Sequence, residues 1–191
     1  MKAVLSPDGY GLLPVTDIAA DLLEGFDCAK PRLNAFIRDK ASFFHRERLG
    51  FTWVVVHEDC PNVVAYFTLS NDAVTLTSSE EADLGLADHA DLQRFPAVNI
   101  GRLAVSANFH QTGVSDHVMR LALDAIRGDA SLSTAARLVV VDADNDDRVL
   151  RYYQRHGFTI SLWADKQALH QGSKRQPRAT IKMLRDILVS W

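Results

Sequence analysis

A strand pattern in the middle of the chain slips once in phase. Val98 and Ile100 share one parity, whereas Leu103 and Val105 share the other. Because successive side chains of a strand point to opposite faces, an extra residue must reset the phase between these pairs, as a β-bulge does. Gly101 suits the left-handed backbone that such a bulge can need. The sequence therefore predicts a strand that kinks near Gly101.

A helix pattern follows this strand after a polar loop. From Gly113 onward the apolar residues recur at the spacing of one helix face, at Val114, Val118, Leu121, Ala122, Ala125 and Ile126. The helix should end near Gly128. Its first N–H groups lack partners and carry the positive end of the helix dipole, so a phosphate is a natural occupant of the loop. The alternative is an ordinary turn that faces water, since neither the P-loop motif nor GxGxxG occurs.

The remaining patterns predict further helices and strands on both sides of this stretch. Helical spacing of Leu33, Phe36, Ile37, Ala41 and Phe44 predicts one helix over residues 31–44. Strands are expected at 51–56 and 62–70 as an antiparallel pair, and at 136–143 as a central strand. Two further strands are expected at 158–163 and 179–187. A helix over 146–158 should be capped by Gly157. With one strand before the first helix, this order predicts an α/β fold with a mixed sheet flanked by helices.

Length and composition favour one soluble domain over residues 1–191. No apolar run is long enough to span a membrane and the N-terminus has no signal-peptide anatomy, so we expect a cytoplasmic protein without a membrane partner. The two cysteines, Cys28 and Cys60, fit neither a disulfide framework nor a metal-binding spacing, so free thiols are expected. The seven histidines are scattered, so no metal site is predicted.

Charge is distributed unevenly although the formal net charge is only −3. Residues 71–94 are strongly acidic, whereas residues 166–185 contain Lys and Arg but no Asp or Glu. We interpret these regions as insertions between core elements, at about residues 71–94 and about 165–178. They are either solvated surface segments or walls of an acceptor groove.

Four motifs together resemble the GNAT superfamily of N-acetyltransferases. GRLAVSANFHQTGVS resembles the acetyl-coenzyme A motif of a strand, a glycine-containing loop and a helix, and VVVDADNDDRVLRYYQRHGF resembles the following strand and its helix with Tyr-x-x-x-Gly-Phe. TIKMLRDI resembles the closing strand. FDCAKPRLNAFIRDKA resembles the first motif of a branch that includes bacterial toxins of toxin–antitoxin pairs.

The resemblance implies an acetyl-CoA-dependent acyltransferase with the GNAT fold, a mixed and mostly antiparallel sheet. In this family the bulged strand splays from the strand that follows it, and the wedge between them holds the pantetheine arm along the backbone, here Leu103, Ala104 and Val105. The pyrophosphate is then expected at the loop residues His110, Gln111, Thr112, Gly113, Val114 and Ser115.

This loop departs from the family pattern at three positions. Gln111 stands where glycine is usual, Ser115 where glycine or alanine is usual, and His110 where Arg or Gln is usual. Backbone N–H donors persist, but Gln111 must tolerate any positive φ required there, at a cost of about 1 kcal/mol. The hydroxyls of Thr112 and Ser115 are expected to add donors. The departures leave open a loop that serves something other than CoA.

Acetyl transfer to an amine needs a proton donor for the departing thiolate, and Tyr153 matches the tyrosine that the family uses. Tyr152 is its competitor, and both could instead be packing residues. The N–H of Val105 is the expected oxyanion donor. Glu58 and Asp142 are conceivable general bases, and we assign neither.

Other charged residues near these motifs have simpler explanations. A surface ion pair is the ordinary role for Arg102, although contact with cofactor or acceptor is open. Asp146 fits a helix cap.

The acceptor is not identified by the sequence. We expect a primary amine of a small molecule or protein; the alternatives are a toxin-like enzyme that acts on aminoacyl-tRNA and a CoA-binding pseudoenzyme that works through a partner. RNA is less favoured because the chain is mildly acidic. A homodimer is left open.

Overall fold

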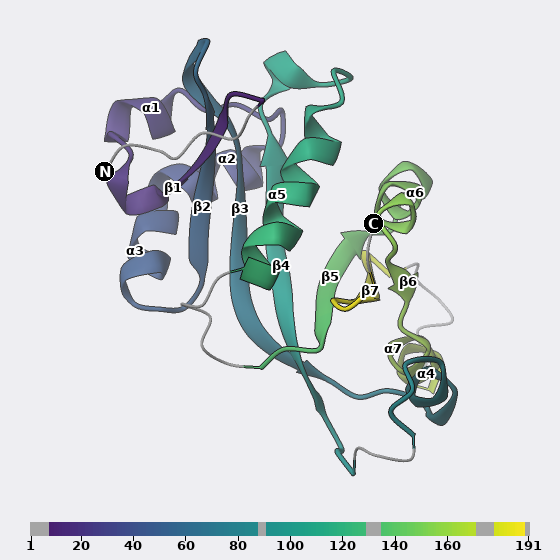
Figure 1. Ribbon diagram of the computed structural model, residues 1–191. Helices are drawn as coiled ribbons and strands as arrows, with labels where there is room; N and C mark the ends of the chain where they lie inside the picture. Colours follow the sequence, from purple (N-terminus) through teal and green to yellow (C-terminus); the bar gives the residue numbers. More distant parts are fainter. Residues whose placement is uncertain (1–7, 88–90, 129–134, 171–177, 190–191) are drawn as a thin grey trace. The chain divides into compact units, whose positions relative to one another are not determined.

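The computed structural model describes residues 8–87, 91–128, 135–170 and 178–189, and its strands form one seven-stranded sheet in the order β1-β2-β3-β4-β5-β7-β6 (Figure 1). The strands are β1 (Tyr10–Pro14), β2 (Phe51–His57), β3 (Cys60–Val74), β4 (Phe95–Val105), β5 (Leu138–Asp144), β6 (Thr159–Ile160) and β7 (Thr180–Asp186). β4 and β5 are parallel, whereas β1/β2, β2/β3, β5/β7 and β6/β7 are antiparallel. The predicted mixed sheet is confirmed.

Helices connect these strands. They are the 3-10 helix η1 (Val15–Asp17), α1 (Ala20–Glu24), α2 (Pro31–Asp39), α3 (Ala41–Arg46), α4 (Ser78–Asp83), the 3-10 helix η2 (Ala107–Phe109), α5 (Val114–Gly128), α6 (Asp147–Arg155) and α7 (Leu162–His170). The predicted α5 and α6 are confirmed, and Gly157 follows α6 with φ +77°, as expected of a left-handed cap. The buried face of α5 includes Met119 and Leu123, whereas Leu121 and Ala125 are only half-buried.

Two compact units divide the chain. The first unit comprises Met1–Ser70 and Ile100–Gly128, and the second comprises Asn71–Asn99 and Asp129–Trp191. β3 and β4 run from one unit into the other, and the single domain stays a prediction.

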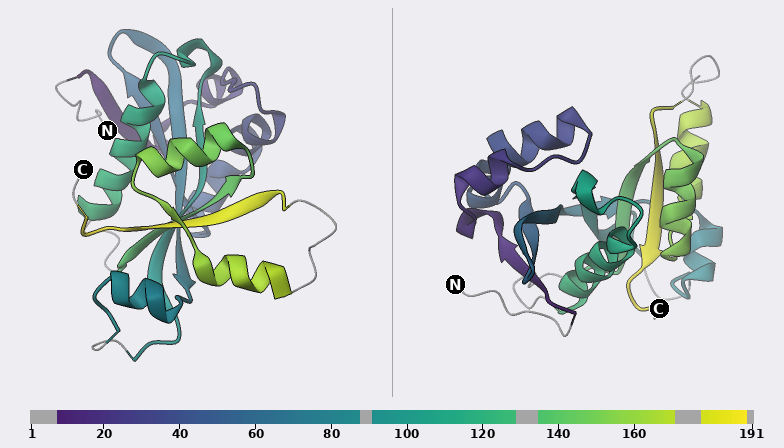
Figure 2. Two further views of the ribbon diagram at one scale, coloured as in Figure 1. Left: turned by 90° about the vertical axis from the view of Figure 1, so that its right-hand side faces the viewer. Right: turned by 90° about the horizontal axis from the view of Figure 1, so that it is seen from above.

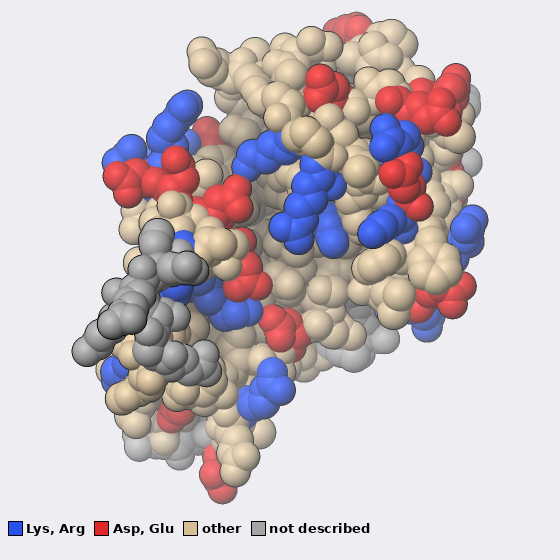
Figure 3. All heavy atoms as spheres, turned by 180° about the vertical axis from the view of Figure 1, so that it is seen from behind, with Lys and Arg blue, Asp and Glu red and all other residues tan. Residues whose placement is uncertain are grey.

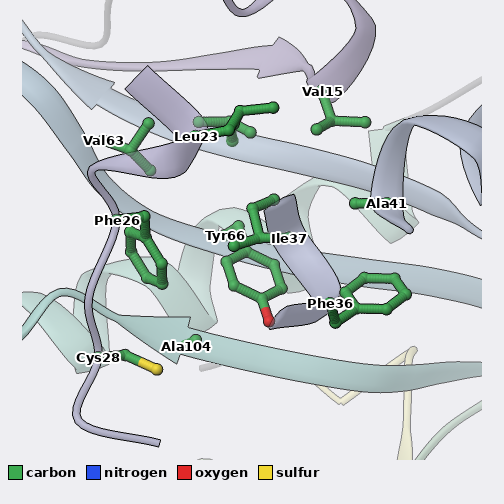
Figure 4. Packing of buried hydrophobic residues seen from close by; sticks show 11 residues of the cluster. Val15, Leu23, Phe26, Cys28, Phe36, Ile37, Ala41, Val63, Tyr66 and Ala104 are labelled. Carbon is green, nitrogen blue, oxygen red and sulfur yellow. The ribbon is translucent and has the colours of Figure 1, made fainter. Parts of the chain in front are cut away.

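Within the first unit, α5 covers one face of the strands and α1–α3 cover the other (Figure 2). The core on the side of α1–α3 gathers large side chains from separate elements, among them Phe26, Phe36, Ile37 and Tyr66, against Ala104 of β4 (Figure 4). Tyr66 closes this core with a hydroxyl that donates to the Leu33 carbonyl at 2.9 Å. α2 is therefore bonded to β3, and Ala104 of β4, the strand with the predicted cofactor backbone, packs in the same core.

Within the second unit, β5 is the buried centre. Residues 138–141 are at most 1% exposed, which confirms the predicted central strand. Residues Ala97–Asn99 of β4 pair with Leu138–Val140, and β7 pairs with all of β5 on its other side. The wedge beyond this short parallel pairing stays a prediction.

The single helix predicted over residues 31–44 is wrong. Lys40 leaves helical geometry, with φ −128°, and separates α2 from α3. The side chain of His45 in α3 accepts the N–H of Thr52 in β2 at 3.2 Å. The second helix is thus bonded to β2, and the apolar spacing of residues 31–44 does not report this contact.

The strand predicted over residues 158–163 is confirmed only at Thr159–Ile160, and its second half is helical instead. Ser161 instead begins α7: its Oγ accepts the Ala164 N–H, and its carbonyl accepts the Asp165 N–H. Glu80 of α4 accepts the N–H of Leu162 at 2.8 Å. A serine cap and a distant carboxylate together convert the expected strand into a helix.

The two charged segments contain regular structure and contact each other. The acidic one includes the end of β3 and α4, and the basic one includes part of α7; residues 88–90 and 171–177 lie outside the described residues. Lys182 lies 3.5 Å from Asp72, so opposite charges of the two segments pair. Their role as walls of an acceptor groove stays a prediction.

One detail of the predicted bulge is wrong. Gly101 is absent from the described residues with positive φ, and β4 is continuous from Phe95 to Val105. Several kinds of bulge need no left-handed residue, which is why a glycine alone does not determine the backbone. The bulge itself stays a prediction.

Candidate functional site

The backbone of β4 presents alternate residues to its two edges. The N–H of Ser106 donates to the Val64 carbonyl of β3 at 2.8 Å. Because backbone groups of successive strand residues point to opposite edges, the groups of Leu103 and Val105 point away from β3 and those of Ala104 toward it. Of the three residues predicted to pair with pantetheine, Leu103 and Val105 therefore have the required direction. Ala104, 4% exposed, contributes its side chain to the core.

His110 is bound to the end of this strand. Its Nε2 lies 3.1 Å from the Val105 carbonyl oxygen, and because a carbonyl only accepts, Nε2 carries the proton and donates. The His110 backbone N–H donates to the Ala107 carbonyl at 3.2 Å. The imidazole thus orients the loop against β4. Sequence reasoning missed this contact, since it compared His110 only with the Arg or Gln of the family.

The loop before α5 has the backbone that its predicted role requires. Gln111 has φ +64° and Gly113 has φ +84°, so Gln111 does adopt the positive φ anticipated from its place in the motif. The Gly113 carbonyl accepts the N–H of Asp116 at 3.1 Å and begins the helix. A Cβ added at Gly113 would meet nothing within 4 Å. The start of α5 is therefore open at this point.

The side chains of the loop contribute less than expected. The Thr112 hydroxyl donates to the Phe109 carbonyl at 2.7 Å, so its proton is already used. This corrects the expectation that the Thr112 hydroxyl is a free donor. Residues 110–113 are exposed, Val114 is buried and Ser115 is half-buried. The cofactor role of all six loop residues stays a prediction.

The segment after α1 holds the end of β4 from the other side. The Ala107 N–H donates to the Asp27 carbonyl at 2.8 Å. The Asp27 carboxylate accepts the Ala29 N–H at 2.8 Å and the Asn34 side-chain amide at 2.7 Å. These two bonds, with a smaller contribution from His110, lower the pKa of Asp27. Much of the FDCAKPRLN motif thus builds a structural loop.

The two cysteines are free thiols, as predicted, and Cys28 is buried in this loop. The Asn34 side-chain oxygen accepts both the backbone N–H and the thiol of Cys28, each at 3.0 Å. Burial raises the pKa of the Cys28 thiol, which keeps it protonated and unreactive.

Tyr153 lies in α6 of the second unit. Its ring packs edge-on against Phe158, with centroids 5.5 Å apart, and against Tyr152 at 5.3 Å. Burial, and to a lesser extent the charge of Asp144, raises the pKa of Tyr153 to about 12. Among the described residues of its unit, its hydroxyl has no hydrogen-bond partner. The phenol is thus fully protonated at neutral pH and keeps its proton available.

The remaining predicted residues are placed as follows. Asp146 caps α6, as expected, by accepting the N–H groups of Arg148 and Val149. Asp142 lies 3.5 Å from Lys182 and Glu58 is exposed, and neither is assigned as a general base. The ion pair expected of Arg102 is absent within the described part of the first unit; its guanidinium instead lies over Phe36.

Two other features are absent from the described residues. They contain no group of three or more His, Cys, Asp or Glu placed to hold a metal ion. Of the helices that the structure describes, none has both the length and the apolar composition needed to cross a membrane.

The chain matches no known family model in a sequence scan, but its structure is similar to those of bacterial toxins. AtaT complexed with acetyl-methionyl-tRNAfMet has a TM-score of 0.68 at 19% identity, covering 91% of this chain and 93% of that one. AtaTR bound with acetyl-CoA has a TM-score of 0.64 at 20% identity, covering 92% and 93%. A tyrosine-to-phenylalanine mutant of KacT has a TM-score of 0.67 at 19% identity, covering 91% and 94%. The chain therefore has the GNAT fold of these proteins, as its motifs predict.

Proposed function

We propose that this protein is an acetyl-CoA-dependent N-acetyltransferase that moves the acetyl group directly to a primary amine. The observation that carries the proposal is the loop before α5, where positive φ at Gln111 and Gly113 leaves the helix start open for a pyrophosphate. The shared fold supports it, since a neighbour of that fold, AtaTR, is solved with acetyl-CoA.

The residues have separate tasks in this reaction. The backbones of Leu103 and Val105 pair with the pantetheine arm, and the Val105 N–H stabilises the developing oxyanion. The neutral amine attacks the thioester carbon, the bond from carbon to sulfur breaks, and the thiolate takes the proton of Tyr153. The nitrogen loses a proton as the amide forms, and that proton passes through solvent to restore the Tyr153 phenol. The raised pKa of Tyr153 supports this assignment, because the proton donor must be neutral when the thiolate leaves.

Turnover of a matched pair of variants tests the proposal. Tyr153→Phe should lower kcat by about 100-fold or more, the loss expected for a general acid, while acetyl-CoA binds as before. Tyr152→Phe is the control, because this neighbour shares the helix and the ring contact. The assignment fails if Tyr152→Phe loses turnover while Tyr153→Phe keeps it. Acetyl-CoA that does not bind the unaltered protein would contradict the activity itself.

Aminoacyl-tRNA is the second candidate acceptor, because AtaT is solved with acetyl-methionyl-tRNAfMet. The net charge of −3 opposes it, since RNA binding rests on phosphate neutralisation. We therefore expect no potent toxicity and favour amines of small molecules or proteins. Inducing the protein alone in a bacterial host separates the two: rapid arrest that Tyr153→Phe relieves, with N-acetylated aminoacyl-tRNA, would establish the second candidate.

A further inference from the structure

Arg102 of β4 is held in an unusual setting. Its guanidinium carbon lies 3.7 Å from the ring centroid of Phe36 and 5.9 Å from that of Phe44. The two rings pack edge-to-face, with centroids 5.6 Å apart, so they form a firm apolar support. One face of the half-buried guanidinium is thereby covered, and its position is fixed by stacking.

The positive charge of Arg102 has no counter-ion among the described residues of its own unit. Within the described part of the first unit it forms no ion pair or hydrogen bond. Burial lowers the pKa of Arg102, and the second cation Arg32 of α2 lowers it further, whereas the Tyr66 hydroxyl acts in the opposite direction. A guanidinium still stays charged at neutral pH, and a partly desolvated charge without a partner is costly. Such a group is better explained by an anion that it binds than by packing alone.

The side of the strand on which Arg102 lies indicates which substrate it meets. Arg102 contacts Phe36 of α2, whereas the loop that would hold the cofactor's pyrophosphate begins α5. α2 and α5 cover opposite faces of the first unit's strands (Figure 2). Seen from the side of α1–α3, several Lys and Arg side chains gather in one region (Figure 3). An acceptor that enters on the α2 side of β4, opposite the loop before α5, meets Arg102.

We propose that Arg102, with Arg32 beside it, binds an oxyanion of the acceptor, a carboxylate or a phosphate, so that the preferred substrates are amines that also carry a negative group. This rests on the proposed acetyltransferase function and names its substrate class. The stacked guanidinium directs its N–H groups along the plane, which allows two parallel hydrogen bonds to one oxyanion. Lysine would keep the charge but lose this fork and the stacking on Phe36.

Binding of simple oxyanions can be followed at Arg102 itself. In the full chain with saturating CoA, which fills the loop before α5, we would titrate inorganic phosphate and, separately, acetate, and record the arginine Nε–H signals by NMR. The Arg102 signal, assigned by its loss in Arg102→Gln, should shift with at least one anion. Affinity should fall about 10-fold or more in Arg102→Lys. Arg38→Gln is the matched control, because Arg38 is exposed and already paired with Asp39.

The relative affinities of phosphate and acetate distinguish a phosphorylated acceptor from a carboxylated one. The kinetic test compares two amines that the enzyme acetylates, one with a carboxylate or phosphate and one in which that group is replaced by an uncharged one. Arg102→Gln should raise KM for the anionic amine without changing its kcat, and should leave KM for the uncharged amine as it was. The proposal is overturned if neither anion moves the Arg102 signal in protein that binds CoA. If CoA itself does not bind, the proposed function fails separately, and the Arg102 titration is then read in the free protein.

Discussion

α5 and α6 both follow a strand and a short loop, yet their first turns are completed in different ways. At α6 the carboxylate of Asp146 accepts two backbone N–H groups of the first turn, at 2.9 and 3.3 Å. At α5 the corresponding residue is Gly113, which has no side chain to offer. One helix is thus capped by the carboxylate of the residue before it, whereas the other has no cap side chain and nothing within 4 Å of a Cβ at Gly113, although Asp116 lies in its first turn.

The difference shows how one fold can use the same local unit for two purposes. A self-capped helix gains stability from the bond between its cap and its backbone. A glycine-capped helix forgoes that bond and keeps its positive end accessible. Gln111 adopts a positive φ, which costs free energy for a residue other than glycine. The loop therefore keeps this backbone in spite of the strain.

Placing an aspartate before α5, as Asp146 stands before α6, should make the two helix starts alike. We expect this change to have the largest effect, a loss of acetyl-CoA affinity. In Gly113→Asp the new carboxylate takes the N–H groups and repels the pyrophosphate, so we expect acetyl-CoA affinity to fall by about 100-fold or more. Gly85→Asp is the control for backbone strain, because Gly85 also has positive φ with nothing within 4 Å of a Cβ. Calorimetry with equal affinities in the two variants would contradict the role of Gly113.

Removing the cap of α6 should change stability and leave the cofactor site intact. Asp146→Ala loses both N–H acceptors, and we expect the free energy of unfolding to fall by about 1 kcal/mol. Asp146→Asn, which keeps an acceptor, should lose less. Chemical denaturation measures the difference. A loss of acetyl-CoA affinity in folded Asp146→Ala would show that the two helices do not differ as described.

The smallest expected effect is the change in stability with pH that arises from Tyr153 of α6. Its pKa, about 12 in the folded protein, lies above that of an exposed tyrosine. Burial of the neutral phenol therefore contributes stability that is fully present below about pH 10 and is lost as pH rises toward the folded-state pKa. The difference in tyrosinate absorbance between the unaltered protein and Tyr153→Phe isolates this group. A transition in that difference near the ordinary tyrosine pKa would mean that the ring is not buried.

Local chemistry explains which parts of the fold the sequence predicts. The strand of residues 138–141 is buried on both faces and reads as a continuous apolar run. Gly157 and Asp146 act within one turn of their helix, so their caps are visible in the sequence. The open loop was also predictable, because the motif places Gln111 at a position that requires positive φ.

Contacts between separate segments explain the rest. Ser161 does signal a helix start, but the contribution of Glu80 comes from a residue 82 positions away. The bond between His45 of α3 and Thr52 of β2 joins a helix to a strand. Likewise, Arg102 of β4 stacks on Phe36 of α2, and His110 of the loop bonds back to Val105 of β4. Neither the hydrophobic pattern nor the motifs predict which of these residues come into contact.

The central claim is that the open start of α5 binds the cofactor's pyrophosphate, and comparing two donors by calorimetry tests it most directly. Acetyl-CoA and acetyl-pantetheine share the thioester and the arm, but only acetyl-CoA carries the pyrophosphate. We predict that acetyl-CoA binds at least about 10-fold more tightly and that Gly113→Asp removes most of this advantage. Equal affinities of the two donors for the unaltered protein, or an advantage unchanged in Gly113→Asp, would contradict the claim.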